Sequence, residues 1–286
     1  MTDPINYAGL RSPRSDLETA RIVVLPVPYD GTSTWGKGAD KGPAALLAAS
    51  ANMELYDIET DSEVYRLGIH TAASITAGPA PETMVEAVRR RVGALLDRGK
   101  FVLTVGGEHS VSIGAVAACA ARCKDLTVVQ LDAHSDLRDA YEGSKYNHAC
   151  VMARAAELCD IVQVGIRSMD VSEKPAIQPG RVFFAETIHD YDEWFDAALD
   201  RLTANVYITV DLDVFDGSEM PSTGTPEPGG LRWYQVIAFL RRVFARANVV
   251  ACDVVELCPN KYNRAPDFLA AKLTYKMLSY RFMDTK

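Results

Sequence analysis

Apolar residues along the chain follow two alternating patterns. Short continuous runs rich in Val, Ile and Leu are separated by segments in which apolar residues recur every three or four positions, as on one face of a helix. The eight runs that predict strands begin at Arg21, Val64, Phe101, Leu126, Ile161, Arg181, Val206 and Val249. The clearest helical segments span 82–96, 112–121, 231–247 and 265–280. Because most runs are apolar throughout, we expect helices on both faces of the sheet. The pattern predicts an α/β fold, a three-layer α/β/α sandwich around a mostly parallel eight-stranded sheet.

The length and composition fit one folded unit. The 286 residues are 48% hydrophobic and 24% charged, which allows a sizeable core. No linker, internal repeat or low-complexity tract interrupts the alternation of strands and helices. We therefore expect a single domain over residues 1–286.

The charge narrows the classes of partner. A formal net charge of -8 argues against nucleic acids and anionic membranes, because both are polyanions that bind clustered Lys and Arg. A small cationic substrate suits this charge better. The N-terminus has no apolar leader, and no window reaches the roughly 18 apolar residues of a membrane span. We expect a cytoplasmic protein.

Polar motifs directly follow four of the apolar runs. They are "GGEHS" at 106–110, "DAHSD" at 132–136, "DLD" at 211–213 and "DVVELCP" at 253–259. In a parallel α/β sheet, ligands bind where the strands end and the loops begin. Carboxylates at such buried positions are costly to desolvate unless they are paired or bind a metal. The motifs therefore predict a site at the carboxyl edge of the sheet.

The spacing of Asp132, His134 and Asp136 raises a geometric problem for a single metal ion. Alternate residues share one face of a strand, but at about 3.3 Å per residue the outer two would lie about 13 Å apart. Either the chain curls after Ala133, or the three side chains serve two ions about 3.5–4 Å apart. Both alternatives remain open on spacing alone.

The pooled candidate ligands are four carboxylates and two imidazoles. They are His109, Asp132, His134, Asp136, Asp211 and Asp213. A lone histidine or a lone "DLD" more often caps a loop, but three such pieces at three strand ends favour a metal site. Four negative charges balance two divalent cations. Ligation rich in oxygen and free of thiolate favours Mn²⁺, with Fe²⁺, Ni²⁺, Co²⁺ and Zn²⁺ as alternatives.

These motifs resemble the signature blocks of the ureohydrolase family of arginases, agmatinases and related guanidino hydrolases. "GGEHS", "LDAHSD" and "TVDLDVFDGSEMPSTGTPEPGGL" are similar to its three metal blocks, and "DVVELCP" resembles its final strand. The resemblance runs from about Tyr29 to Met277. It implies a hydrolase with two manganese ions, an eight-stranded parallel sheet in an α/β/α sandwich, and assembly into homo-oligomers, usually trimers or hexamers.

The resemblance also implies a division of ligands between the two ions. One ion would be held by His109, Asp132, Asp136 and Asp211. The other would be held by Asp132, His134, Asp211 and Asp213. Asp132 and Asp211 would then bridge the ions. Glu108 stands where many members have Asp, but that position is not a family ligand.

Three residues are predicted to take part in catalysis. Asp136 would hydrogen-bond the attacking hydroxide and orient it. The resemblance implies that His148 shuttles a proton to the departing amine, a role suited to a group that titrates near neutrality. Glu256 would pair its planar carboxylate with the planar guanidinium. His70 and His189 match no family position and are interpreted as structural.

The predicted function is hydrolysis of agmatine to putrescine and urea. Asp139 and Glu142, in the segment before His148, could attract the bare ammonium of agmatine and repel the carboxylate of arginine. The alternatives are an arginase, a guanidinobutyrase, an aminopropylagmatine hydrolase, a formimidoylglutamase or, more distantly, a zinc deacetylase. A non-catalytic member that binds metal or a guanidino compound is a further alternative.

Overall fold

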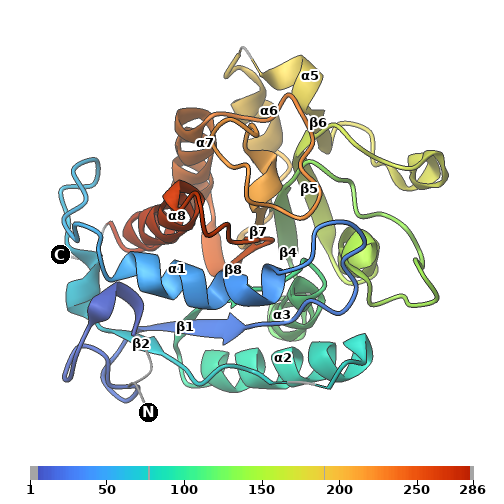
Figure 1. Cartoon of the computed structure of the whole chain (residues 1–286). Helices are drawn as coiled ribbons and strands as arrows, with labels where there is room; N and C mark the ends of the chain where they lie inside the picture. Colours follow the sequence, from blue (N-terminus) through green and yellow to red (C-terminus); the bar gives the residue numbers. More distant parts are fainter. Residues whose placement is uncertain (1–5, 77, 190, 284–286) are drawn as a thin grey trace.

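The computed structural model describes residues 6–76, 78–189 and 191–283, and eight parallel strands form its centre (Figure 1). The strands are β1 (Ile22–Val27), β2 (Ile69–Thr71), β3 (Phe101–Gly106), β4 (Leu126–Leu131), β5 (Asp160–Ile166), β6 (Val182–Phe184), β7 (Asn205–Asp211) and β8 (Asn248–Val255). Their order in the sheet is β2-β1-β3-β8-β7-β4-β5-β6, and every pairing between neighbours is parallel. The predicted mostly parallel sheet is confirmed.

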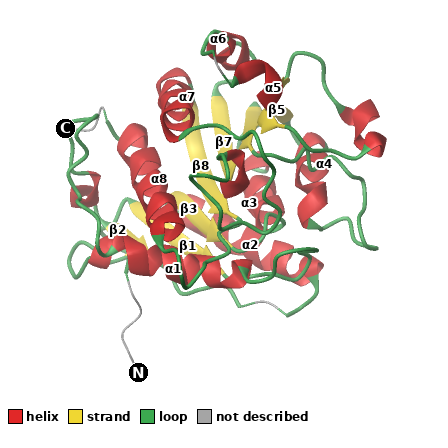
Figure 2. Ribbon diagram, turned by 45° about the horizontal axis from the view of Figure 1, so that its top comes forward, coloured by secondary structure: helices red, strands yellow, loops and turns green. Residues whose placement is uncertain are grey.

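Helices cover both faces of this sheet (Figure 2). They are α1 (Gly42–Ser50), α2 (Pro81–Leu96), α3 (Val111–Ala120), α4 (Val151–Ala156), α5 (Ala185–Ile188), α6 (Trp194–Leu199), α7 (Trp233–Arg246) and α8 (Ala265–Arg281). In Figure 1, α1, α7 and α8 lie on one side of the strands, and α2 and α3 lie on the other. Within the described residues, every helix is too short or too polar to cross a membrane.

Two apolar clusters fill the layers on either side of the sheet, and β1 shows how one strand supplies both. Ile22 and Val24 pack into the cluster that includes α1, α7 and α8, whereas Val23 and Leu25 pack into the cluster that includes α2, α3 and α4. Successive side chains of a strand point to opposite faces, so a run covered on both sides must be apolar at every position. Each fully buried Val, Leu or Ile contributes about 1.5–3 kcal/mol relative to exposure.

Two predicted strands are shorter than their apolar runs. The residues Val64–Leu67 form a 3₁₀ turn, and β2 begins only at Ile69. The intervening Gly68 has φ +78°, and a Cβ there would lie 2.8 Å from the Cα of Ala20, so an extended strand cannot pass through it. Similarly, the run that starts at Arg181 gives way to α5 at Ala185.

The order of the strands brings the four polar motifs together. The motifs follow β3, β8, β7 and β4, and these are consecutive neighbours in the middle of the sheet. Because all strands run in the same direction, their carboxyl ends meet at one edge. Residues separated by more than one hundred positions in sequence therefore meet at this edge.

Candidate metal centre and active site

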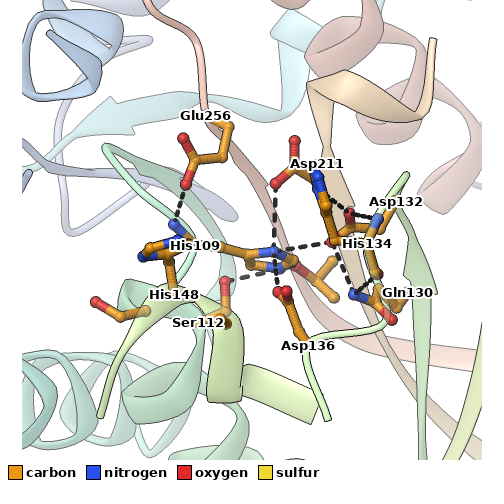
Figure 3. A network of polar contacts seen from close by, with 12 residues as sticks. His109, Ser112, Gln130, Asp132, His134, Asp136, His148, Asp211 and Glu256 are labelled. Atoms are coloured by element: carbon orange, nitrogen blue, oxygen red, sulfur yellow. Dashed lines mark hydrogen bonds and ion pairs between the residues drawn. The ribbon is translucent and has the colours of Figure 1, made fainter. Parts of the chain in front are cut away.

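The side chains at the carboxyl ends of β3, β4 and β7 form two compact groups of potential metal ligands. His109, Asp132 and Asp211 offer ligand atoms that all lie within 4.8 Å of one another, and Asp132, His134 and Asp213 do the same. Asp132 belongs to both groups. Figure 3 shows the imidazole of His109 directed toward Asp132, Asp136 and Asp211. All six predicted ligands thus meet at one place.

The group around His109 leaves a nitrogen atom without a hydrogen-bond partner. Its Nδ1 is buried and makes no hydrogen bond, yet it lies 3.0 Å from Asp132 Oδ2, 3.1 Å from Asp136 Oδ2 and 3.3 Å from Asp211 Oδ2. One imidazole lone pair and three carboxylate oxygens that converge in this way fit a divalent cation. The structure therefore supports a metal ion at this position.

The second group is arranged around His134. Its Nδ1 lies 2.9 Å from Asp213 Oδ2 and 3.6 Å from Asp132 Oδ1. The other oxygen of Asp213 accepts a hydrogen bond of 2.9 Å from the backbone of Ala133, which holds the end of β7 against the end of β4. With Asp132 common to both groups, the buried His and Asp clusters indicate a binuclear metal site.

The backbone after β4 resolves the geometric problem of the Asp132, His134 and Asp136 spacing. The backbone N–H of His134 donates to Asp132 Oδ1 at 2.6 Å, and Asp136 has φ +51°, so the chain curls instead of continuing as a strand. The backbone carbonyl of Asp136 accepts hydrogen bonds from Met152 and Ala153 at the start of α4. Both alternatives that the spacing left open are present, because the chain curls and its side chains also serve two ligand groups.

The carboxylates repel one another in this buried site. Burial, followed by the charge of Asp132, raises the pKa of Asp136 to about 7. Burial and the charges of Asp213 and Asp132 raise the pKa of Asp211 well above its usual value. Bound cations would relieve this repulsion, because they favour the ionised carboxylates.

Polar residues behind the ligands hold them in place. Thr209 Oγ1 lies 2.8 Å from His109 Nε2, so an Nε2–H that donates to Thr209 leaves the lone pair of Nδ1 for a cation. Gln130 Nε2 donates to Asp132 Oδ2 at 2.7 Å (Figure 3). Our sequence interpretation missed both supporting residues. Their signal is a polar residue inside an apolar run, two positions before the first aspartate of each motif and therefore on the same strand face.

Glu256 meets the same site from the end of β8. Its Oε1 accepts a hydrogen bond of 2.7 Å from the backbone N–H of His109, and its own φ is +67°. Only 9% of Glu256 is exposed, and burial, together with the charge of Glu108, raises the pKa of its carboxyl well above the usual value. The position of this acid agrees with the sequence prediction.

A cavity of about 250 Å³ opens over these groups. The polar residues that line it include His109, His134, Asp136, His148, Asp211 and Glu256. Its other lining residues include Arg138, Tyr141, Met169, Asp170 and Glu173. A larger hollow of about 1080 Å³, between α7, α8 and residues 54–59, contains neither ligand group.

Residues 20–279 match the sequence model of the Arginase family. The chain belongs to this family. It is 40% identical over 272 residues to an N(1)-aminopropylagmatine ureohydrolase of Synechocystis sp., a match that covers 91% of this chain and 89% of the relative. It is 33% identical over 276 residues to an agmatinase of Pyrococcus horikoshii, covering 93% and 94% of the two chains. The structure of the agmatine ureohydrolase of Thermoplasma volcanium matches with a TM-score of 0.86 and 31% identity, covering 99% of this chain and 96% of that one.

This member of the Arginase family is a ureohydrolase, an enzyme that hydrolyses linear amidines. The predicted family and enzyme class are confirmed. Among the substrates considered from the sequence, the comparisons favour aminopropylagmatine, which we had kept as an alternative, over agmatine.

Asp139 and Glu142, the two acids that were expected to select the substrate tail of this ureohydrolase, are not among the described residues that line the cavity. Asp139 pairs with Arg154 at 2.8 Å and Lys145 at 3.3 Å, and Glu142 lies in a turn with φ +47°. The acids that do line the cavity beyond the ligands and Glu256 are Asp170 and Glu173, which follow β5.

His148 lines the cavity of the ureohydrolase, and its pKa is lowered from its usual value. Burial first, and then the charges of His134 and His109, lower the pKa of His148 to about 4. A lowered pKa favours the neutral imidazole, which gains a proton before it delivers one. His70 lies away from the cavity, and its Nδ1 is 2.8 Å from the carbonyl of Ser15.

Proposed function

We propose that this ureohydrolase removes the guanidino group of N(1)-aminopropylagmatine as urea and releases the corresponding triamine. The observation that carries the reaction is that Glu256 and both ligand groups border one cavity. The observation that carries the substrate is the higher identity to an N(1)-aminopropylagmatine ureohydrolase, 40%, than to an agmatinase, 33%. Agmatine is the second candidate, because it lacks only the aminopropyl extension.

We further propose that the six ligands hold two Mn²⁺ ions. His109, Asp132, Asp136 and Asp211 would hold one, and Asp132, His134, Asp211 and Asp213 would hold the other. The contacts of Asp132 to both histidines and the unpartnered Nδ1 of His109 support this assignment. When bound, two such cations lower the pKa of a shared water and so supply a strong nucleophile near neutral pH.

Three side chains of the cavity would bind the substrate, orient the water and transfer the proton. Glu256 binds the N–H groups of the substrate guanidinium through its planar carboxylate and fixes the position of the central carbon. Asp136 accepts a hydrogen bond from the attacking water and orients it toward that carbon. The C–N bond to the alkyl chain then breaks, and His148, having gained a proton, gives it to the departing amine. One water is consumed, and urea and an alkylammonium ion leave.

The rim of the cavity suits a cationic tail. Asp170 borders the cavity with 43% of its side chain exposed, and its nearest cationic partner, Arg138, is 3.8 Å away. Arg138 also lies against the ring of Tyr141, with its guanidinium carbon 4.3 Å from the ring centroid. An ammonium group of the substrate would pair with Asp170 while Arg138 keeps its contact with Tyr141.

A panel of substrates tests the proposal. We expect kcat/KM, measured with purified Mn²⁺-loaded protein at one pH, to be highest for N(1)-aminopropylagmatine, lower for agmatine and lowest for arginine and 4-guanidinobutyrate. A higher value for agmatine would refute the preferred substrate and support the second candidate. Absence of urea from every guanidino compound would favour a non-catalytic member of the family.

The domain and the assembly of the chain are a further part of the proposal. We propose that residues 1–286 form one ureohydrolase domain and that the chains assemble into trimers or hexamers. Light scattering of the purified protein would measure the assembly.

A further inference from the structure

The hydroxyl of Thr32 lies between His148 and a buried acid. Thr32 Oγ1 is 3.2 Å from His148 Nδ1 and accepts a hydrogen bond of 3.0 Å from the backbone N–H of His148. The same hydroxyl donates to Glu108 Oε2, and the hydroxyl of Ser110 donates to the other oxygen of Glu108. Thr32 is 8% exposed and Glu108 is fully buried. The contact joins residues 116 positions apart in the chain.

The donors and acceptors at this hydroxyl constrain the imidazole. A threonine hydroxyl has one proton and two lone pairs, and here the proton is directed to Glu108. Its lone pairs can therefore accept from the backbone N–H of His148 and from a proton on Nδ1. This arrangement selects the tautomer of neutral His148 that carries its proton on Nδ1. The lone pair of Nε2 is then the one that can take a proton from the reacting groups.

The segment that carries Thr32 is fixed at both of its ends. The backbone N–H of Gly38 donates to Asp30 Oδ2 at 2.6 Å, and the backbone N–H of Gly36 donates to the carbonyl of Gly224 at 3.1 Å. A Cβ at Gly36 would lie 2.8 Å from that carbonyl oxygen, so the two segments are in close contact. The hydroxyl of Thr32 is thus held by the fold before any substrate arrives.

We infer that Thr32 is a positioning residue, whose hydroxyl, anchored on Glu108, orients His148 and sets its tautomer for proton transfer. The inference rests on the proposed function, in which His148 moves the proton to the departing amine. Thr32 acts through His148 and needs no contact with the substrate. Its loss should therefore lower kcat while KM and metal content stay unchanged.

The test compares variants of Thr32 in the metal-loaded enzyme. Thr32→Val removes the hydroxyl at nearly constant volume, Thr32→Ala removes it without a branched side chain, and Thr32→Ser retains it. We expect Val and Ala to lower kcat about 10²-fold, as for a misplaced general acid–base group, and Ser to restore most of the rate. Thr274→Val removes a buried hydroxyl that donates to the Ala270 carbonyl in α8, and it should leave kcat unchanged.

A double-mutant cycle separates positioning of His148 from other effects. If Thr32 acts through His148, Thr32→Val should have no further effect on kcat in a His148→Asn background. Wild-type kcat in Thr32→Val, equal losses in the Ser and Val variants, or additive losses in the double mutant would each overturn the inference. If instead His148→Asn alone leaves kcat unchanged, the proposed role of His148 fails, and the inference on Thr32 fails with it.

Metal analysis and melting temperatures of every variant show whether a loss of rate comes from a damaged site. A loss of metal in Thr32→Val would also overturn the inference.

Discussion

Asp132 faces both histidines of the metal centre, with Oδ2 at 3.0 Å from His109 Nδ1 and Oδ1 at 3.6 Å from His134 Nδ1. Asp132 directly follows β4, and Gln130 donates a hydrogen bond to its Oδ2. One carboxylate therefore belongs to both ligand groups, which share the ends of β4 and β7. The consequences of this arrangement can be measured.

Asp132→Ala should remove both metal ions, because each ligand group loses a member. Asp213→Ala should weaken metal binding mainly in the group around His134, since Asp213 contacts His134 and not His109. Activity of Asp132→Ala should fall below about one hundredth, since even outer partners of a ligand contribute 10- to 100-fold. Elemental analysis of the purified variants checks this prediction. Two ions in Asp132→Ala would show that it does not bridge.

Thr209→Val should weaken metal binding about 10- to 100-fold without removing any ligand. The variant loses the hydroxyl that contacts His109 Nε2, so the imidazole is no longer held in one orientation. Thr127→Val is a matched control, because Thr127 is a buried threonine near the opposite end of the sheet that contacts Thr203. Metal titration should show weaker binding in the first variant only. Equal affinities would exclude a role for Thr209.

His148→Asn should keep both metal ions and lower kcat about 10²- to 10⁴-fold. Burial is the largest cause that lowers the pKa of His148, and it favours the neutral imidazole, which can accept a proton. Added imidazole should restore part of the rate by replacing the missing base. Unchanged turnover in a variant with its full metal content would remove His148 from the mechanism.

Asp170→Asn should raise KM for N(1)-aminopropylagmatine about tenfold and change kcat little, because a charge-assisted contact to the tail is lost. Asp139→Asn is the matched control. Asp139 pairs with Arg154 and Lys145 and is not among the described residues that line the cavity, so it should leave KM unchanged. Steady-state kinetics of the two variants shows which of the two acids binds the substrate tail. A rise in KM for Asp139→Asn alone would restore the assignment made from the sequence.

Lys276→Met should destabilise the fold by about 3 kcal/mol at pH 7, because it leaves the buried carboxylate of Asp57 without its cation. Lys276 pairs with Asp57 at 3.0 Å and also contacts Glu59. Burial alone would raise the pKa of Asp57, but hydrogen bonds from Thr60 and Lys276 lower it overall.

The pH dependence of that loss follows from the sign of the shift. A lowered folded-state pKa contributes stability that is present above the unfolded value and lost as the pH falls. In Lys276→Met the unpaired Asp57 should instead take up a proton readily, so the destabilisation should shrink between pH 7 and pH 4. Denaturant unfolding at the two pH values measures it. A constant difference would contradict the charge-pair explanation.

The sequence predicted which side chains meet at this edge of the sheet because their signal is local. Each ligand directly follows an apolar run, and parallel strands bring such ends to one edge, so His109, Asp132 and Asp211 could be grouped without coordinates. The contact of Thr32 with His148 had no such signal, since it depends on how two distant loops pack. Asp139 was expected to face the substrate because it precedes His148 in the sequence, but His148 lines the cavity whereas Asp139 pairs with Arg154.

The left-handed backbone conformation of Glu256 sets the stability of this enzyme against its proposed activity. A non-glycine residue with φ +67° carries a conformational cost of about 1–2 kcal/mol, and Asp136 adds a second such residue in the same site. Glycine at either position would relax the backbone but remove a carboxylate that the proposed mechanism uses. Screening for thermostability alone would therefore tend to select variants that have lost their activity.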